Sequence, residues 1–130
     1  MLRRGAGAIA PAHVAFAVFG YLAVAPEYYR IRWLRGNVSD GSYLRKGYSL
    51  AAFTVAGFLL ARAQRSLGRS PTLAGSAFIV ALFSTGIEIA QRLAGSHETL
   101  GSNAIDVLFG AAGGALGGYL ERAAATYGRR

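Results

Sequence analysis

The segment between Asp106 and Glu121, DVLFGAAGGALGGYLE, encloses 14 consecutive uncharged residues and repeats glycine at helical spacing. A membrane-spanning helix needs about 20 mostly apolar residues and can extend a charged side chain to the interface at each end. Three other runs have the same character: Arg4 to Glu27 encloses 22 uncharged residues, Lys46 to Arg62 encloses 15, and Arg69 to Glu88 encloses 18. The sequence therefore predicts four membrane-spanning helices.

The length and composition leave little room for anything else. The chain has 130 residues, of which 15% are charged, against about 25% in an average soluble protein. We expect an all-α integral membrane bundle, a single domain over residues 1–130. Its helices are expected at about 8–25, 47–63, 72–93 and 103–123, with a short interfacial segment after the first. The absence of cysteine excludes disulfides, thiolate catalysis and cysteine-held metals, and we expect no cofactor or metal.

The net charge of +8 is spread over the short segments between the apolar runs. A basic face for nucleic acid would be concentrated instead, so we expect membrane lipid as the anionic partner and no nucleic acid. Eight Lys and Arg residues lie with the termini and the second loop, and six lie with the first and third loops. The positive-inside rule then predicts a multi-pass protein with both termini in the cytoplasm.

The segment after the first predicted helix interleaves aromatic and basic side chains. It contains Tyr28, Tyr29, Arg30, Arg32, Trp33 and Arg35. Amphipathic aromatics suit the headgroup layer, and arginine can bind lipid phosphates. Two interpretations remain open: an interfacial belt, or a dedicated site for a phospholipid or an anionic glycan.

The fourth predicted helix carries a packing signal made of glycine. Its members are Gly110, Gly114 and Gly118, with Gly113 and Gly117 beside them. Such small-x-x-x-small patterns let helix backbones approach closely in lipid. The partner is either the second or third helix of the same chain, or a second copy or another membrane protein.

Polar side chains near the end of the third predicted helix share a depth with those near the start of the fourth. Helical spacing puts one set on a common face, namely Ser84, Glu88, Gln91 and Arg92. A short hairpin brings Glu88 and Asp106 to the same side of the membrane as Lys46. Three interpretations follow: a structural polar network of these six residues, a binding or catalytic site with Glu88 and Asp106 as candidates, or ion conduction.

These residues carry a resemblance to a known family. The pattern Ser84-x-x-x-Glu88-x-x-Gln91, followed by Asp106-x-x-x-Gly110-x-x-Gly113, resembles the C-terminal signature of the VanZ-like family of small four-span bacterial membrane proteins. Lys46 also matches the lysine of the family's D-K-x-x-H-x-x-x-Y element. The resemblance covers about residues 44–120. It implies a bacterial inner-membrane location and an association with the cell envelope, including glycopeptide resistance in the namesake, but no settled reaction.

The chain departs from the family pattern at several positions. Arg45 replaces an aspartate, Ser49 a histidine, Phe53 a tyrosine and Gly110 an asparagine, and the family's loop arginine has no counterpart. Histidine is the side chain best suited to proton transfer near neutral pH. Its loss argues against an enzymatic role in this chain.

Three functions are therefore considered. The first is a non-enzymatic accessory or structural subunit that packs against lipid or a larger membrane complex. The second is a protein that binds or modifies an isoprenoid-linked or anionic envelope lipid, with Glu88 and Asp106 as acid–base candidates, Gln91 orienting, and Arg92 and Lys46 holding phosphate. The third is a small transporter component.

Overall fold

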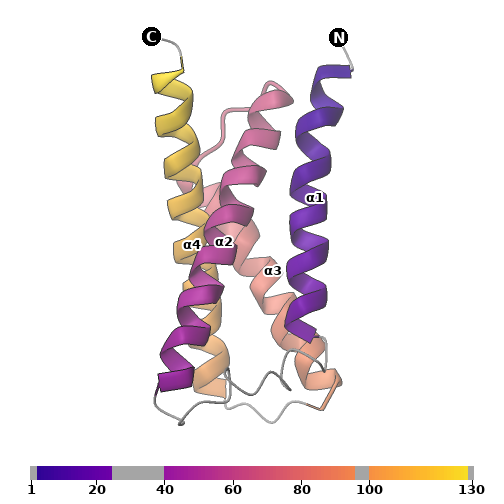
Figure 1. The fold of residues 1–130 in the computed structure, drawn as a ribbon, viewed down its shortest axis with the longest axis vertical. Helices are drawn as coiled ribbons and strands as arrows, with labels where there is room; N and C mark the ends of the chain where they lie inside the picture. The colour runs from indigo at the N-terminus through magenta and orange to yellow at the C-terminus, as the bar shows by residue number, and fades with distance from the viewer. Residues whose placement is uncertain (1–2, 25–39, 96–99, 129–130) are drawn as a thin grey trace.

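The computed structural model describes residues 3–24, 40–95 and 100–128. It contains four helices, α1 (Arg3–Val24), α2 (Asp40–Ser66), α3 (Leu73–Leu93) and α4 (Leu100–Tyr127), and no strand in the described residues. The predicted all-α class with four helices is confirmed (Figure 1). The interfacial segment expected after the first helix lies outside the described residues.

Three helices extend beyond the predicted ranges. α1 begins at Arg3 rather than near residue 8, α2 begins at Asp40 rather than near 47, and α4 covers Leu100–Tyr127 rather than 103–123. The predicted limits followed the loss of apolar character. Several residues in the added turns, such as arginine, lysine and alanine, are good helix formers. The backbone therefore stays helical past the ends of the apolar runs.

The start of α3 differs from the prediction by one residue. Thr72 has an extended backbone (φ −103°, ψ 150°), and its hydroxyl accepts a hydrogen bond from the backbone N–H of Gly75 at 3.0 Å. This is the geometry of a helix N-cap, in which a side-chain oxygen satisfies a free N–H of the first turn. The helix proper therefore begins at Leu73.

α2 ends in a tight turn built on glycine. Gly68 has φ +75°. Glycine adopts this conformation at little energetic cost because it has no Cβ. The N–H of Gly68 donates to the carbonyl of Arg65, and the N–H of Arg69 donates to the carbonyl of Gln64, each at 3.0 Å. These two bonds form a Schellman motif, which satisfies carbonyls at the end of the helix. Arg69 is thereby fixed just beyond the last turn of α2.

The helices run alternately in opposite directions, so both ends of the chain lie at one end of the bundle (Figure 1). We call this the termini end; it also holds the turn between α2 and α3. The opposite end, where α2 and α4 begin and α3 finishes, is the loop end. α4 packs against both α2 and α3, whereas α1 contacts α2 and α3 but, within the described residues, not α4. α2, α3 and α4 therefore form the tight part of the bundle.

The interior of the bundle is made of small side chains. The largest fully buried ones are Val80, Ser76 and Ser84. A modest apolar cluster adds Phe53 and Ile87, with Phe16 of α1 and Phe83 of α3 packed against it. The two phenyl rings of that last pair meet edge to face, with centroids 4.6 Å apart. Aromatic contacts thus attach α1, whereas small residues fill the space between α2, α3 and α4.

Among the described helices, α3 alone is long and apolar enough to cross a membrane by length and composition. Its most apolar window has a mean hydropathy of 1.8, and only 17% of that window is buried. α1 has a shorter apolar stretch, Ile9–Ala23. α2 and α4 are rich in glycine and alanine, which contribute little apolar surface per residue. That these three helices also span a membrane stays a prediction.

Candidate functional site

The glycines of α4 lie in two adjacent rows, of which one faces α2. Gly113 and Gly117 form this row, and both are buried. A methyl group placed on Gly113 would lie 2.6 Å from Cβ of Phe53, and one on Gly117 would collide with the carbonyl oxygen of Thr54 and the backbone nitrogen of Phe58. Contacts this short leave no room for any side chain. The backbones of α2 and α4 therefore touch directly.

The second row faces α3 and consists of Gly110, Gly114 and Gly118. A methyl group on Gly110 would lie 2.8 Å from Cβ of Ser84. One on Gly114 would lie 2.7 Å from the carbonyl oxygen of Ser76 and 2.8 Å from Cβ of Val80. The hydroxyl oxygen of Ser76 is itself fully buried and has no hydrogen-bond partner among the described residues.

α2 contributes a glycine of its own that sequence reasoning missed. A methyl group on Gly57 would lie 2.7 Å from the carbonyl oxygen of Gly114 and 2.8 Å from its Cα. We call the six residues the glycine seam: Gly57, Gly110, Gly113, Gly114, Gly117 and Gly118. In this fold the seam is filled by helices of the same chain, so it offers no surface to a second one.

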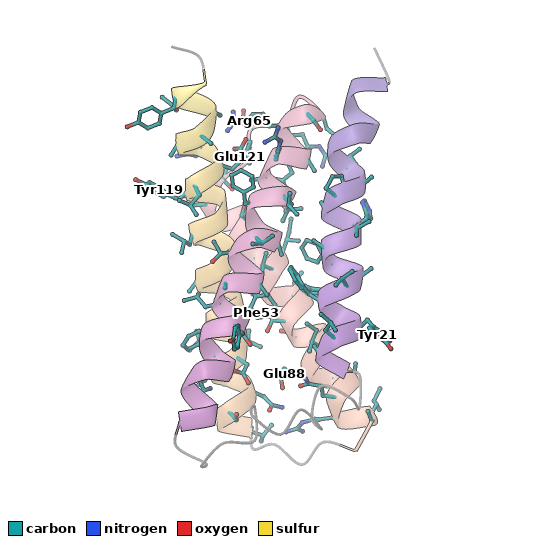
Figure 2. All side chains as sticks on the ribbon, in the orientation of Figure 1. Tyr21, Phe53, Arg65, Glu88, Tyr119 and Glu121 are labelled. Carbon is teal, nitrogen blue, oxygen red and sulfur yellow. The ribbon has the colours of Figure 1, made fainter. Side chains whose placement is uncertain are left out.

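A bidentate ion pair closes the seam at the termini end. Nε and Nη2 of Arg65 donate to the two carboxylate oxygens of Glu121, each at 2.8 Å. The side chain of Glu121 is 5% exposed and that of Arg65 36%. Figure 2 shows both residues toward the termini end. Arg65 lies beyond residue 63, where the second helix was predicted to end. Its hydrogen bonds with Glu121 raise the pKa of the guanidinium above its ordinary value. The pair therefore ties α2 to α4.

Sequence reasoning used Glu121 only as the boundary of an uncharged run. One signal could have identified its role, because Glu121 follows Gly117 by four residues and so lies on the same helix face. A carboxylate on a face that is otherwise glycine must be buried, and a buried carboxylate needs a cation.

A looser ion pair lies at the loop end. Nζ of Lys46 is 3.4 Å from Oδ1 of Asp106, and the two side chains are 18% and 17% exposed. The ammonium group also lies 5.8 Å from the ring centroid of Phe109, within the range of a cation–π contact. The hydroxyl of Ser84 donates to the backbone carbonyl of Asp106 at 3.2 Å. Three of the six predicted network residues thus meet across α2, α3 and α4.

The other three predicted network residues lie in the last two turns of α3. Nε2 of Gln91 donates to the carbonyl of Ala23 at 2.8 Å, which ties α3 to α1. Arg92 is exposed in the last turn of α3. Glu88 is half-buried and extends toward the middle of the bundle near the loop end (Figure 2).

The predicted lipid-interface residues lie outside the described part of the chain: Tyr28, Tyr29, Arg30, Arg32, Trp33 and Arg35. Within the described residues no group of three or more His, Asp or Glu side chains is placed to hold a metal ion. Among the contacts of the described residues, the loop end therefore offers the partly accessible Lys46–Asp106 ion pair and nearby polar groups. Such a pair can hold helices together or open to accept an anion.

Comparison with protein-family models, curated proteins and solved structures gives no match to this chain. The resemblance to the VanZ-like family therefore stays a prediction that rests on its sequence pattern.

Proposed function

We propose that the chain is a small multi-pass protein of a bacterial inner membrane, with four helices across the bilayer and both termini in the cytoplasm. It acts by packing, as a non-enzymatic accessory subunit against lipid or a larger membrane complex. One observation carries the proposal: small residues fill the inside of the bundle and large apolar residues cover its outside. In lipid, helices associate through small residues, whereas large apolar side chains face the acyl chains.

α3 shows this distribution most clearly. Phe78 is 64% exposed, and Leu82 and Ile89 are each 56% exposed, while Ser76 and Ser84 of the same helix are buried. In water each Å² of apolar surface left exposed forgoes about 25 cal/mol of stabilisation. A soluble helix would place these residues the other way round, so the pattern supports a lipid environment.

The spacing of charges along the helices also supports the placement. Lys46 and Arg65 are 19 residues apart on α2, which corresponds to about 28 Å of helix. Asp106 and Glu121 are 15 residues apart on α4, or about 22 Å. The longer length is close to the thickness of a hydrocarbon core of about 30 Å, and the shorter one falls below it. One ion pair would then lie near each face of the bilayer.

Exposed tyrosines lie at two levels of the bundle. Tyr21 of α1 lies toward the loop end, and Tyr119 of α4 lies nearer the termini end (Figure 2). Tyr48 begins the apolar part of α2, and Tyr127 ends α4. Tyrosine is enriched at both membrane interfaces because its ring is apolar and its hydroxyl is polar.

The polar contacts favour a structural role over turnover. Asp106, one of the two acid–base candidates, is paired with Lys46, and Ser84 donates to a backbone carbonyl. Lipid binding remains the second candidate function. It is favoured by the 3.4 Å separation and partial exposure of the Lys46–Asp106 pair, which could exchange its carboxylate for a phosphate.

Single cysteines test the membrane placement in this cysteine-free chain. Gly101→Cys reports the loop end and Ser70→Cys the termini end, and both positions are exposed. With intact cells, a membrane-impermeant maleimide should label Gly101→Cys and not Ser70→Cys. In permeabilised cells it should label both variants. The opposite labelling would reverse the orientation. Recovery of the chain in the soluble fraction would contradict the proposal.

Isosteric variants separate the packing role from the lipid-enzyme alternative. Glu88→Gln and Asp106→Asn remove charge but keep hydrogen-bonding shape. A packing role predicts a lower melting temperature and weaker recovery of the assembled protein in mild detergent. An unchanged melting temperature together with loss of an envelope phenotype would favour the lipid-modifying function instead.

A further inference from the structure

The two ends of the bundle differ in charge. At the loop end, acidic and basic residues of the described helices balance: Asp40, Glu88 and Asp106 against Arg45, Lys46 and Arg92. At the termini end, the described residues near the α2–α3 turn and the end of α4 include four arginines and one carboxylate: Arg62, Arg65, Arg69 and Arg122 with Glu121. Arg3 and Arg4 of α1 belong to the same end. The termini end is therefore strongly basic.

The one carboxylate at this end does not neutralise the other arginines. Both oxygens of Glu121 accept hydrogen bonds from Arg65. Within the described residues no carboxylate lies within ion-pair distance of Arg69 or Arg122, and both are exposed. Two permanent cations therefore remain available to an external anion.

The fold places the backbone of Arg69 and the guanidinium of Arg122 at the same corner. The Schellman turn fixes Arg69 just past the end of α2. Nη2 of Arg122 lies 3.5 Å from the carbonyl oxygen of Pro71, which joins α4 to the same turn. Pro71 is two residues from Arg69, a distance of at most about 7 Å along the chain. We call Arg69 and Arg122 the arginine corner.

The groups around the arginine corner suit a phosphate. Each guanidinium presents several N–H donors in a planar fork that matches phosphate oxygens. Ser70, an exposed residue between Arg69 and Pro71, adds a hydroxyl donor. The dipole at the start of α3 also favours negative charge, although the net charge comes from the arginines.

Apolar surface adjoins the same corner. Leu67 lies in the turn and is exposed, and Phe78 is exposed on α3, seven residues beyond Pro71. A soluble anion would leave these apolar side chains exposed, whereas the acyl chains of a lipid would cover them. We propose, on the basis of the membrane placement above, that the arginine corner binds the headgroup phosphate of an anionic phospholipid in the cytoplasmic leaflet.

The test compares lipids with the full-length chain in mild detergent, by native mass spectrometry and by the shift in melting temperature. Phosphatidylglycerol should bind and raise the melting temperature, whereas phosphatidylcholine and inorganic phosphate should not. Each arginine near an anionic surface contributes about 1 kcal/mol, so the Arg69→Gln/Arg122→Gln variant should bind phosphatidylglycerol roughly tenfold to thirtyfold more weakly. Arg62→Gln, which removes an exposed arginine of α2 outside the arginine corner, should bind like the parent chain.

Single Arg69→Gln keeps the Arg122 contact with Pro71 and should weaken binding by about fivefold or more even where the double variant folds poorly. Equal binding by parent and Arg69→Gln would overturn the proposal, as would an equal loss in Arg62→Gln. Competition by inorganic phosphate would make this a free-phosphate site instead. A chain that stays in the membrane fraction but prefers no lipid refutes only the arginine corner. A soluble chain refutes the membrane placement.

Discussion

The inner and outer surfaces of α3 and α4 are built from opposite kinds of residue. The inner surface is glycine and serine, and the outer surface carries Phe78, Leu82 and Leu108, all more than half exposed. Soluble proteins bury their large apolar residues because water drives them inward. Lipid supplies no such drive, so close contact between backbones has to hold the helices together. The contrast supports the proposal that the sequence is suited to lipid rather than to water.

The inner surface derives its cohesion from backbone contacts along the glycine seam. Positions where a methyl group would lie 2.7 Å from a carbonyl oxygen are positions where a glycine Cα–H points at that oxygen. Gly57 points in this way at Gly114, and Gly114 points at Ser76. Such Cα–H···O contacts contribute about 0.5–1 kcal/mol each. The seam thus combines close packing with weak polar contacts repeated from helix to helix.

The largest expected effect comes from filling the seam. Gly114→Leu would drive a side chain into the backbone of α2 and α3, and overpacking of this kind should cost at least about 3 kcal/mol of unfolding free energy. Gly86→Leu is the matched control, because a Cβ there meets nothing within 4 Å. It should be neutral or slightly stabilising, since leucine has the higher helix propensity. Denaturant unfolding in detergent measures both, and equal effects would contradict the seam.

The free energy of unfolding that is lost when an ion pair is broken should be larger for the more buried pair. Arg65→Gln leaves the buried carboxylate of Glu121 without its cation and should lower the free energy of unfolding by about 2 to 3 kcal/mol. This value is at the lower edge for a broken buried pair because Arg65 is partly exposed. Glu121→Gln should cost less, about 1 kcal/mol, since the guanidinium can reach water. Lys46→Gln should cost about 1 kcal/mol or less, because that pair is longer and more accessible. A double-mutant cycle checks this order, and a larger loss for Lys46→Gln would contradict it.

The smallest effects should lie on the outer surface. Phe78→Ala should cost within about 1 kcal/mol, because the side chain faces lipid in both the folded and the unfolded state. Val80→Ala, two residues away and fully buried, should cost about 1 to 2 kcal/mol through loss of packing. Thermal unfolding in detergent compares the two. A loss of about 3 kcal/mol or more for Phe78→Ala would indicate a buried aromatic, and hence a partner on that face or a different fold.

The sequence was sufficient to predict four helices and the inward face of α4. Uncharged runs mark where a helix can be apolar, and glycine repeated every four residues marks the side on which no side chain is present. The helix ends at Asp40 and Tyr127 were missed because helical propensity continues where the apolar character stops. Local pattern therefore located each helix but not its full length.

Contacts between helices were harder to predict. Arg65 and Glu121 are 56 residues apart, and their pairing depends on the rotation and the vertical offset of α2 against α4. Neither quantity follows from the pattern of a single helix. The same holds for the loop end, where the structure pairs Asp106 with Lys46, leaves Arg92 exposed and directs Gln91 to α1. Depth was predictable from sequence, but the choice of partner was not.

The central claim is that all four helices present their large apolar side chains to lipid. Nitroxide labels at single cysteines replacing Val14, Val55, Leu82 and Leu116 test it directly, because each lies on the outside near the middle of a different helix. In liposomes, electron paramagnetic resonance should show high accessibility to oxygen and low accessibility to a water-soluble nickel chelate at all four positions. High accessibility to the nickel chelate at Val14, Val55 or Leu116 would show that the helix concerned does not cross the bilayer, and would contradict the four-span account.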